Sequence, residues 1–182
     1  GFAGRISDKR KNAVLLFEAF RELRLRGVVH ELHIAGPLDD FSSKLIASIG
    51  LSGSVKFLGY LNQGQLRQMY QKLDVFAITS YQEGLGISGL EAMACGVPVV
   101  STKCGGPEDF VQDGITGYLS ASSPIEFADS VCRLLADQQK YRKISNECRR
   151  TVREKFSVPK FSNAFYEAWL SVWGEDYRKK TF

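Results

Sequence analysis

Between residues 74 and 101, two apolar stretches flank a glycine-containing turn and a segment with helical spacing. Residues 74–79 and 97–101 have the composition of buried strands, and residues 87–95 repeat apolar side chains at the period of a helix. The segment therefore predicts a strand, a loop, a helix and a second parallel strand. In open parallel sheets, a loop in this position lies at the edge where ligands bind.

The predicted loop carries a group of residues suited to a ligand that has both phosphate and sugar. Gly84 and Gly86 let the backbone approach a ligand closely, and the start of the helix offers N–H groups to an anion. Glu83 and Glu91, eight positions apart, add acceptors for sugar hydroxyls. The combination indicates a sugar nucleotide.

The rest of the chain continues the alternation of strand and helix patterns. Further strands are predicted at residues 2–6, 31–35, 55–58 and 117–119. Helices are predicted between the strands at residues 13–26, 42–49, 65–72 and 107–111, and after the last strand at 124–135, 138–155 and 158–173. This order predicts one doubly wound, Rossmann-like α/β domain over residues 1–182, with a mostly parallel sheet covered on both faces.

The last predicted helix carries an aromatic stripe, which is expected to be mostly core. Its members are Phe161, Phe165, Trp169, Leu170 and Trp173. Basic residues cluster at 9–11, 149–155 and 178–180, and solvated helix faces are the favoured interpretation. Weak attachment to an anionic membrane surface is the alternative.

Composition narrows the function classes. A net charge of +4 is too small to indicate a nucleic-acid partner, and the four cysteines lack metal-ligand spacing. We therefore expect no metal site and reduced thiols in a cytoplasmic protein. Because the sequence begins without Met or a signal-peptide pattern, we expect it to be part of a longer protein.

Two cations are predicted at the same sheet edge as the glycine loop. Arg5 follows Gly4 where the first strand ends, and Lys11 precedes the helix that begins after Asn12. Arg offers a diphosphate a fixed bidentate fork, and Lys offers a point charge. Two residues are candidates for the second cation. Alignment on the helix that follows favours Lys11, whereas counting forward from Arg5 favours Arg10.

Several motifs then occur in the order of a known family. They are Glu83-x7-Glu91 with residues 92–100 after it, and the segments at 4–7, 57–60, 105–108 and 113–117. In these motifs the chain resembles the retaining GT-B glycosyltransferases of the family 4 type. The resemblance implies the C-terminal, donor-binding half of a GT-B fold with C-terminal helices, whose N-terminal acceptor domain is absent from this chain. It also implies that the last helices pack on that other domain, so part of the aromatic stripe is a surface for it.

The resemblance also implies roles for individual residues. Arg5 and Lys11 hold the diphosphate, Glu83 faces the transferred sugar, and Glu91 binds the ribose; Glu83, Arg5 and Lys11 are the catalytic group. Apart from these roles, the turn at Tyr60 either borders the base through its backbone groups or has only a structural role. The donor-binding set is Gly4, Arg5, Lys11, Tyr60, Glu83, Gly84, Leu85, Gly86, Ile87, Ser88 and Glu91.

The implied activity is transfer of a glycosyl group from a nucleotide sugar to a hydroxyl acceptor, with retention and without a cofactor. The acceptor is a sugar, a lipid-linked molecule or another hydroxyl compound, and the place of action is the cytoplasm or the cytoplasmic face of a membrane. The fragment alone is expected to bind nucleotide weakly and to transfer little. A non-catalytic nucleotide-binding or regulatory module and a nucleotide-sugar epimerase remain as alternatives. The sequence leaves the base, the sugar, the acceptor and the oligomeric state open.

Overall fold

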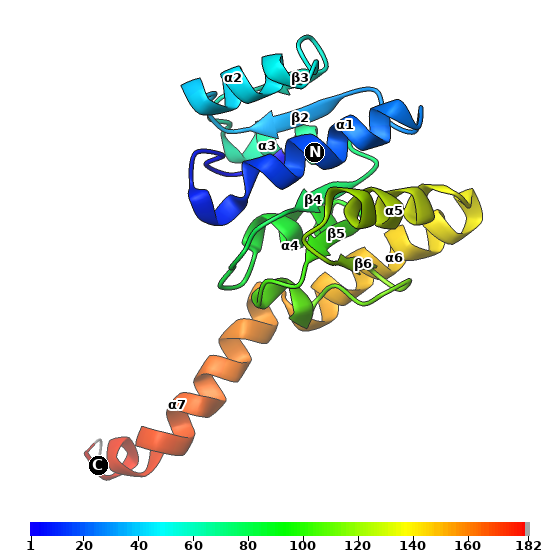
Figure 1. Ribbon diagram of the computed structural model, residues 1–182. Helices are drawn as coiled ribbons and strands as arrows, with labels where there is room; N and C mark the ends of the chain where they lie inside the picture. The colour runs from blue at the N-terminus through cyan, green and yellow to red at the C-terminus, as the bar shows by residue number, and fades with distance from the viewer. Residues whose placement is uncertain (181–182) are drawn as a thin grey trace.

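The computed structural model of the protein describes the backbone of residues 1–180 and the side chains of residues 1–173. The strands are β1 (Phe2–Ala3), β2 (Leu32–Ala35), β3 (Val55–Phe57), β4 (Phe76–Ile78), β5 (Val99–Thr102) and β6 (Gly117–Ser120). The helices are α1 (Ala13–Leu25), α2 (Asp40–Ser48), α3 (Gln63–Tyr70), α4 (Ile87–Ala94), α5 (Pro124–Leu135), α6 (Gln138–Lys155) and α7 (Val158–Lys180). Two short 3-10 helices, η1 (Lys9–Lys11) and η2 (Gly106–Asp109), complete the chain (Figure 1).

The strands form two parallel three-stranded sheets, in the orders β1-β2-β3 and β4-β5-β6. Gly1 joins them, because its amino group donates to the carbonyl oxygen of Val75 at 2.7 Å and its own carbonyl accepts from the N–H of Ala77 at 2.9 Å. The combined order is therefore β3-β2-β1-β4-β5-β6, which is that of a doubly wound dinucleotide-type fold. The predicted fold class is confirmed.

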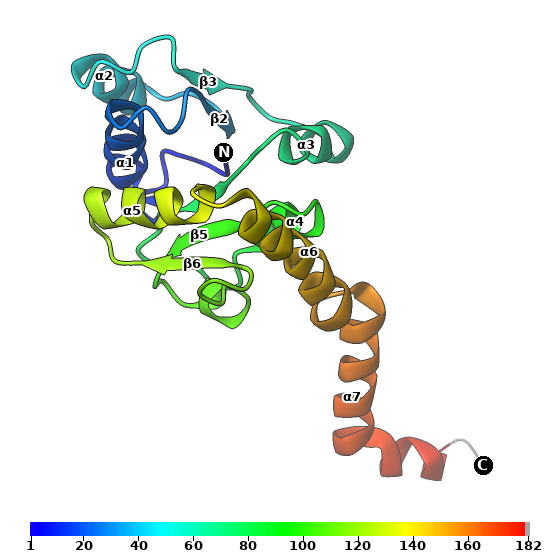
Figure 2. The same ribbon diagram turned by 90° about the vertical axis from the view of Figure 1, so that its right-hand side faces the viewer.

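Helices cover both faces of the sheet. On one face α1 packs against α2 and α5, and on the other α4 packs against α3 and α6 (Figure 2). The core between these layers is apolar and includes the fully buried side chains of Phe17, Phe76, Phe110 and Phe127. Because β1 and β4 are neighbours whose connections leave towards different sides, the loops that follow them meet at one edge of the sheet.

The helix α4 is fixed at its C-terminal end by side chains of α6. The hydroxyl of Ser145 donates to the carbonyl oxygen of Gly96 at 2.6 Å, and the guanidinium of Arg149 donates to that of Cys95 at 3.1 Å. A cation and a hydroxyl there satisfy carbonyl groups that the end of a helix leaves unpaired.

The structure corrects details of the prediction. Every predicted strand exists, but most are shorter than predicted. In place of the α-helix predicted at residues 107–111, the structure has the 3-10 helix η2 at Gly106–Asp109. The helices α5 and α6 have the predicted bounds, since the side chains of Ser123 and Asp137 cap their first turns. Their caps and the proline at the start of α5 mark these ends in the sequence.

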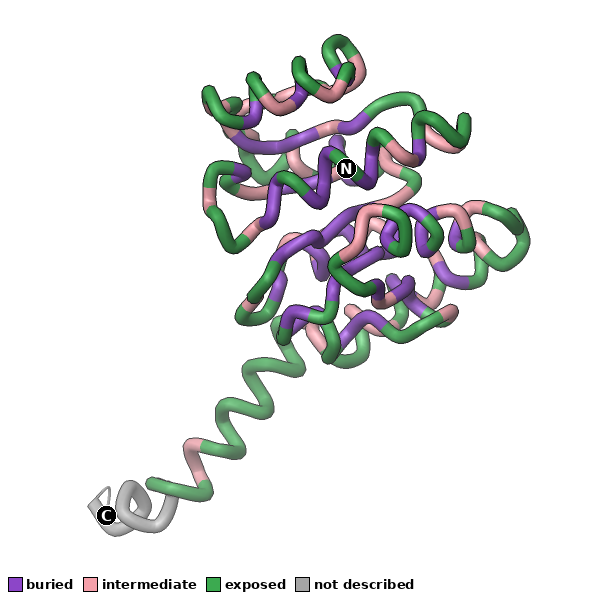
Figure 3. The backbone as a smooth tube through the Cα atoms, viewed as in Figure 1, coloured by how far each residue is buried: buried purple, intermediate pink, exposed green. Residues whose placement is uncertain are grey.

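The prediction that the aromatic stripe is mostly core is wrong. The helix α7 leaves the body of the molecule, and Phe161, Phe165 and Trp173 are 71%, 64% and 58% exposed (Figure 3). Trp169 and Leu170 are half-buried. The spacing correctly indicated a helix with an apolar face, but periodicity does not say which body covers such a face.

The described side chains of the second basic cluster are exposed, as a solvated helix face predicts. The side chains of the third, at residues 178–180, lie outside the described residues. Among the helices described here, none combines the length and the apolar character needed to span a bilayer.

Candidate functional site

Two loops meet at the carboxyl edge of the sheet. One contains η1 and connects β1 to α1, and the other connects β4 to α4. The hydroxyl of Thr79 donates to the carbonyl oxygen of Lys11 at 2.8 Å, and the N–H of Tyr81 donates to that of Arg10 at 2.7 Å. These bonds hold the loop between β1 and α1, here called the basic loop, against the loop between β4 and α4, here called the glutamate loop. Residues more than sixty positions apart therefore share one site.

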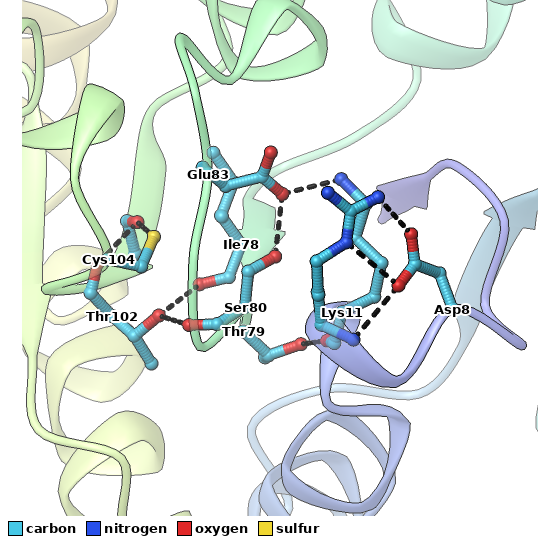
Figure 4. Close-up of polar contacts among 10 residues, drawn as sticks. Asp8, Lys11, Ile78, Thr79, Ser80, Glu83, Thr102 and Cys104 are labelled. Carbon is cyan, nitrogen blue, oxygen red and sulfur yellow. Dashed lines mark hydrogen bonds and ion pairs between the residues drawn. The ribbon is translucent and has the colours of Figure 1, made fainter.

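At the centre of this contact, Lys11 and Glu83 form an ion pair. Their Nζ and Oε1 atoms are 2.5 Å apart, and the hydroxyl of Ser80 donates to the same oxygen at 2.7 Å (Figure 4). The side chain of Lys11 is 22% exposed and that of Glu83 is 14% exposed. The pair is therefore largely removed from water, and its charges are less screened than those of a surface pair.

The glutamate loop is held from the β5 side as well. The hydroxyl of Thr102 donates to the carbonyl oxygen of Ser80 at 2.6 Å (Figure 4). The N–H of Glu83 donates to the carbonyl oxygen of Cys104 at 2.7 Å. Gly106 is packed so tightly that a Cβ atom there would lie 1.9 Å from the carbonyl oxygen of Gly84. Close backbone packing thus requires glycine at this position.

The helix α4 begins without a side-chain cap. Its N-cap residue, Gly86, has φ +75°, a left-handed conformation that favours glycine, and no described side chain bonds to the first turn. Leu85 and Ile87 are exposed, and Ser88 is half-buried. The first turn therefore leaves N–H groups and the positive end of the helix dipole open to an anion.

A cavity of about 280 Å³ lies at the loop that leads into α4, and its lining residues are Arg10, Lys11, Gln82, Glu83 and Gly84. Arg10 is turned towards Asp8, with Nη2 and Oδ2 2.7 Å apart. The hydrogen bonds from Arg10 lower the pKa of Asp8 to about 2. Lys11 and Arg10, the two candidates for the second cation of the site, thus line the same cavity. Lys11 contacts Glu83, and Arg10 contacts Asp8.

Arg5 lies beside a second cavity of about 290 Å³, together with Gly4, Gly36 and Tyr60. Arg5 and Tyr60 are exposed, and Arg5 forms no ion pair with the described residues. The two cavities are close, since a Cβ atom at Gly4 would lie 3.7 Å from Cε of Lys11. The predicted site residues of the β1 loop are therefore divided between neighbouring cavities.

Glu91 lies one turn into α4 and lines neither cavity. Its Oε2 atom accepts a hydrogen bond of 2.9 Å from the hydroxyl of Tyr70, the last residue of α3. A carboxylate close to buried surface needs a hydrogen-bond partner, and the hydroxyl of Tyr70 supplies one. Burial raises the pKa of Tyr70 far above its usual range, and the Glu91 carboxylate raises it further.

Sequence reasoning missed two members of the site, Ser80 and Tyr70. Ser80 follows the predicted strand and lies three positions before Glu83, a spacing that could have flagged it as a partner of the carboxylate. Tyr70 is 21 positions from Glu91, and no local pattern connects them. Among the described residues, no three His, Cys, Asp or Glu side chains are placed to hold a metal ion.

A family model for glycosyl transferases group 1 matches residues 1–151 of the chain. The chain belongs to the group 1 glycosyltransferases. It is similar to the D-inositol 3-phosphate glycosyltransferase of Actinosynnema mirum, with 36% identity over 146 residues, 73% of this chain and 34% of that protein. It is also similar to the N-acetyl-alpha-D-glucosaminyl L-malate synthase of Bacillus anthracis, with 30% identity over 138 residues, 75% of this chain and 36% of that protein.

Solved structures of group 1 and related glycosyltransferases share the fold. HepE of Anabaena, solved in complex with UDP and glucose, matches 94% of this chain and 47% of its own, with a TM-score of 0.83 and 26% identity. The C-terminal domain of the group 1 protein LpcC of Francisella tularensis matches 87% of this chain and 84% of its own, with a TM-score of 0.73 and 26% identity. The chain thus has the fold of a C-terminal GT-B domain and spans about a third to a half of the full-length relatives.

Proposed function

We propose that this chain binds the nucleotide-sugar donor of a glycosyltransferase, and that the whole protein transfers the glycosyl group to a hydroxyl acceptor with retention. The observation that carries the proposal is the Lys11–Glu83 pair beside the uncapped first turn of α4. A cation lines one cavity, the open N–H groups of α4 begin three residues after the lining residue Gly84, and a fixed carboxylate lines the same cavity. A diphosphate needs the first two and a sugar hydroxyl the third. The relative solved with UDP and glucose supports this assignment.

In this proposal the residues share the work of holding the donor. The side chains of Arg5 and Lys11 contact the diphosphate. Backbone groups contact it as well, from Gly4, Gly84, Leu85, Gly86, Ile87 and Ser88. Glu83 orients the sugar, Glu91 accepts from the ribose hydroxyls, and the turn at Tyr60 borders the base.

The difficult step in such a transfer is departure of the diphosphate. The bond from the anomeric carbon to the diphosphate oxygen breaks, and the oxygen keeps the electron pair. Arg5, Lys11 and the first turn of α4 stabilise the charge that develops there, which is electrostatic catalysis without a metal. Each charge-assisted contact contributes about 1.5–3 kcal/mol. Because Lys11 is already held by Glu83, it is placed before the donor arrives.

The acceptor site is proposed to lie on an N-terminal domain outside this chain. The chain spans 34–47% of the relatives named above that were compared over their full length, which supports that arrangement. The chain alone is then expected to bind nucleotide without appreciable transfer. Full turnover by the isolated chain would contradict this part of the proposal.

Isothermal calorimetry tests donor binding directly. The chain is titrated with UDP, GDP and ADP, and the best ligand is then titrated into Arg5→Ala and Lys11→Met. Each variant is expected to bind about tenfold or more weakly, the loss of one charge-assisted contact. Lys56→Met is the matched control, because Lys56 is exposed on β3 and pairs with Glu31 away from the site. Absence of heat with all three nucleotides would reject the proposal in favour of a module that keeps the fold without the ligand.

A further inference from the structure

We infer that Tyr70 is a positioning residue for the nucleotide ribose: its hydroxyl fixes the Glu91 carboxylate so that the second oxygen of Glu91 faces the ribose hydroxyls. The inference rests on the proposed function, since it assumes a nucleotide beside α4. It adds a residue that lies outside every motif of the site. Tyr70 itself does not touch the ligand, so its effect passes through Glu91.

The geometry of Tyr70 leaves its hydroxyl little freedom. Its side chain is 2% exposed, and its ring meets that of Phe76 edge-on, with centroids 5.5 Å apart and planes at 73°. The ring is therefore held by the core between α3 and β4. From that fixed position the hydroxyl donates to Oε2 of Glu91 at 2.9 Å.

Glu91 has one engaged oxygen and one open oxygen. Oε2 accepts from Tyr70, whereas no described residue donates to Oε1. A glutamate on a helix otherwise distributes its carboxylate among several rotamers, and a bond to one oxygen selects those that the partner allows. Side chains on a helix lean towards its N-terminus, so the carboxylate of Glu91 extends towards the first turn of α4.

The tyrosine hydroxyl also remains a donor under all working conditions. Burial and the negative charge of Glu91 both raise the pKa of Tyr70, in that order of size, so the phenol keeps its proton. Because the phenol has a single hydrogen, which it gives to Glu91, the contact has a fixed direction. Tyr70 therefore orients the carboxylate without competing with the ligand for its open oxygen.

The test compares a nucleoside diphosphate with its dideoxy form, which lacks both ribose hydroxyls. The best binder of UDP, GDP and ADP and its dideoxy counterpart are titrated into the unaltered chain, Tyr70→Phe, Glu91→Gln and Tyr141→Phe. Tyr141 is the matched control, since its half-buried hydroxyl donates to the carbonyl oxygen of Asp74 at 2.9 Å, away from the site. Circular dichroism and thermal unfolding check that each variant is folded.

The unaltered chain and Tyr141→Phe are expected to prefer the ribose form by about tenfold or more, the worth of a hydrogen bond to a charged acceptor. In Tyr70→Phe the preference is expected to fall to about two- to threefold, while the affinity for the dideoxy form stays the same. A purely structural role for Tyr70 would weaken both ligands alike and would overturn the inference. So would a Tyr70→Phe variant that keeps the full preference while Glu91→Gln loses it.

A different result would reject the proposed function together with this inference. That result is an unaltered chain that binds no nucleotide, or a Glu91→Gln variant that keeps the full preference for ribose. The glutamate variant thus reports on the donor site, and the tyrosine variant reports on the positioning role alone.

Discussion

Removal of Lys11 is expected to destabilise the protein because it leaves Glu83 largely buried without its cation. The side chain of Lys11 is 22% exposed and that of Glu83 is 14% exposed, so the burial of this pair lies between that of a surface pair and that of a fully buried pair. Exposed pairs contribute about 0.2–1 kcal/mol, whereas loss of one partner from a buried pair costs about 3–5 kcal/mol. The hydroxyl of Ser80 still donates to Glu83, which limits the loss. We therefore expect Lys11→Met to lower the free energy of unfolding by about 2 kcal/mol.

A double-mutant cycle separates the pair from its surroundings. Lys11→Met, Glu83→Gln and the double variant are unfolded in urea and followed by circular dichroism, without nucleotide. The expected coupling energy between the two residues is about 1.5 kcal/mol, with the double variant recovering part of the loss. The same cycle on Lys56 and Glu31 is the control, since these side chains are 48% and 47% exposed and Glu31 also contacts a second residue, His33. That pair is expected to couple by about 0.5 kcal/mol or less. Equal coupling in the two cycles would refute the reasoning from burial.

Three further predictions concern the loops and the thiols. Gly106→Ala should lower the free energy of unfolding by about 2 kcal/mol or more in urea, because its Cβ would overlap the backbone of Gly84. Gly64→Ala, on the exposed side of α3, should instead be neutral or stabilising. Asp8 has a pKa of about 2 against the ordinary 3.8, so its contribution to stability is present above pH 3.8 and lost as the pH falls towards 2. Asp8→Asn should therefore lose less stability than the unaltered chain over that range in acid unfolding curves, and equal losses would contradict the assignment. Burial raises the pKa of Cys148 to about 12, so its thiol should resist a disulfide reagent at pH 8 until urea is added. The half-buried Cys132 should react in the native chain. Mass spectrometry of the labelled peptides shows which cysteine reacts first.

The order of strands and helices was predictable because each element carries its own local signal. Apolar runs and helical spacing indicated the bounds of α5 and α6 and the alternation of strands and helices that sets the sheet. Strand ends were less predictable. Where a strand stops depends on the hydrogen bonds of its neighbour, as in β1, which pairs with β2 over only Phe2 and Ala3.

The site was predictable only as far as its loops. The chain pattern placed Lys11 and Glu83 at one edge of the sheet, but it did not show that Lys11 faces Glu83 while Arg10 turns to Asp8. That choice depends on the geometry of η1. The roles given to these residues in donor binding remain predictions. Whether the apolar face of α7 packs on the body of this domain could not be predicted either, because an apolar stripe does not identify the surface that covers it.

The attachment of α4 to α6 has a consequence for how variation in this protein is interpreted. Ser145 and Arg149 hold the C-terminal end of α4, and the N-terminal end of the same helix follows the loop that lines the cavity. Substitutions on α6 are therefore expected to shift α4, and with it the loop that carries Glu83, without changing a residue that lines the cavity. Sequence changes at Ser145 or Arg149 belong with those of the pocket when natural variants are sorted by effect.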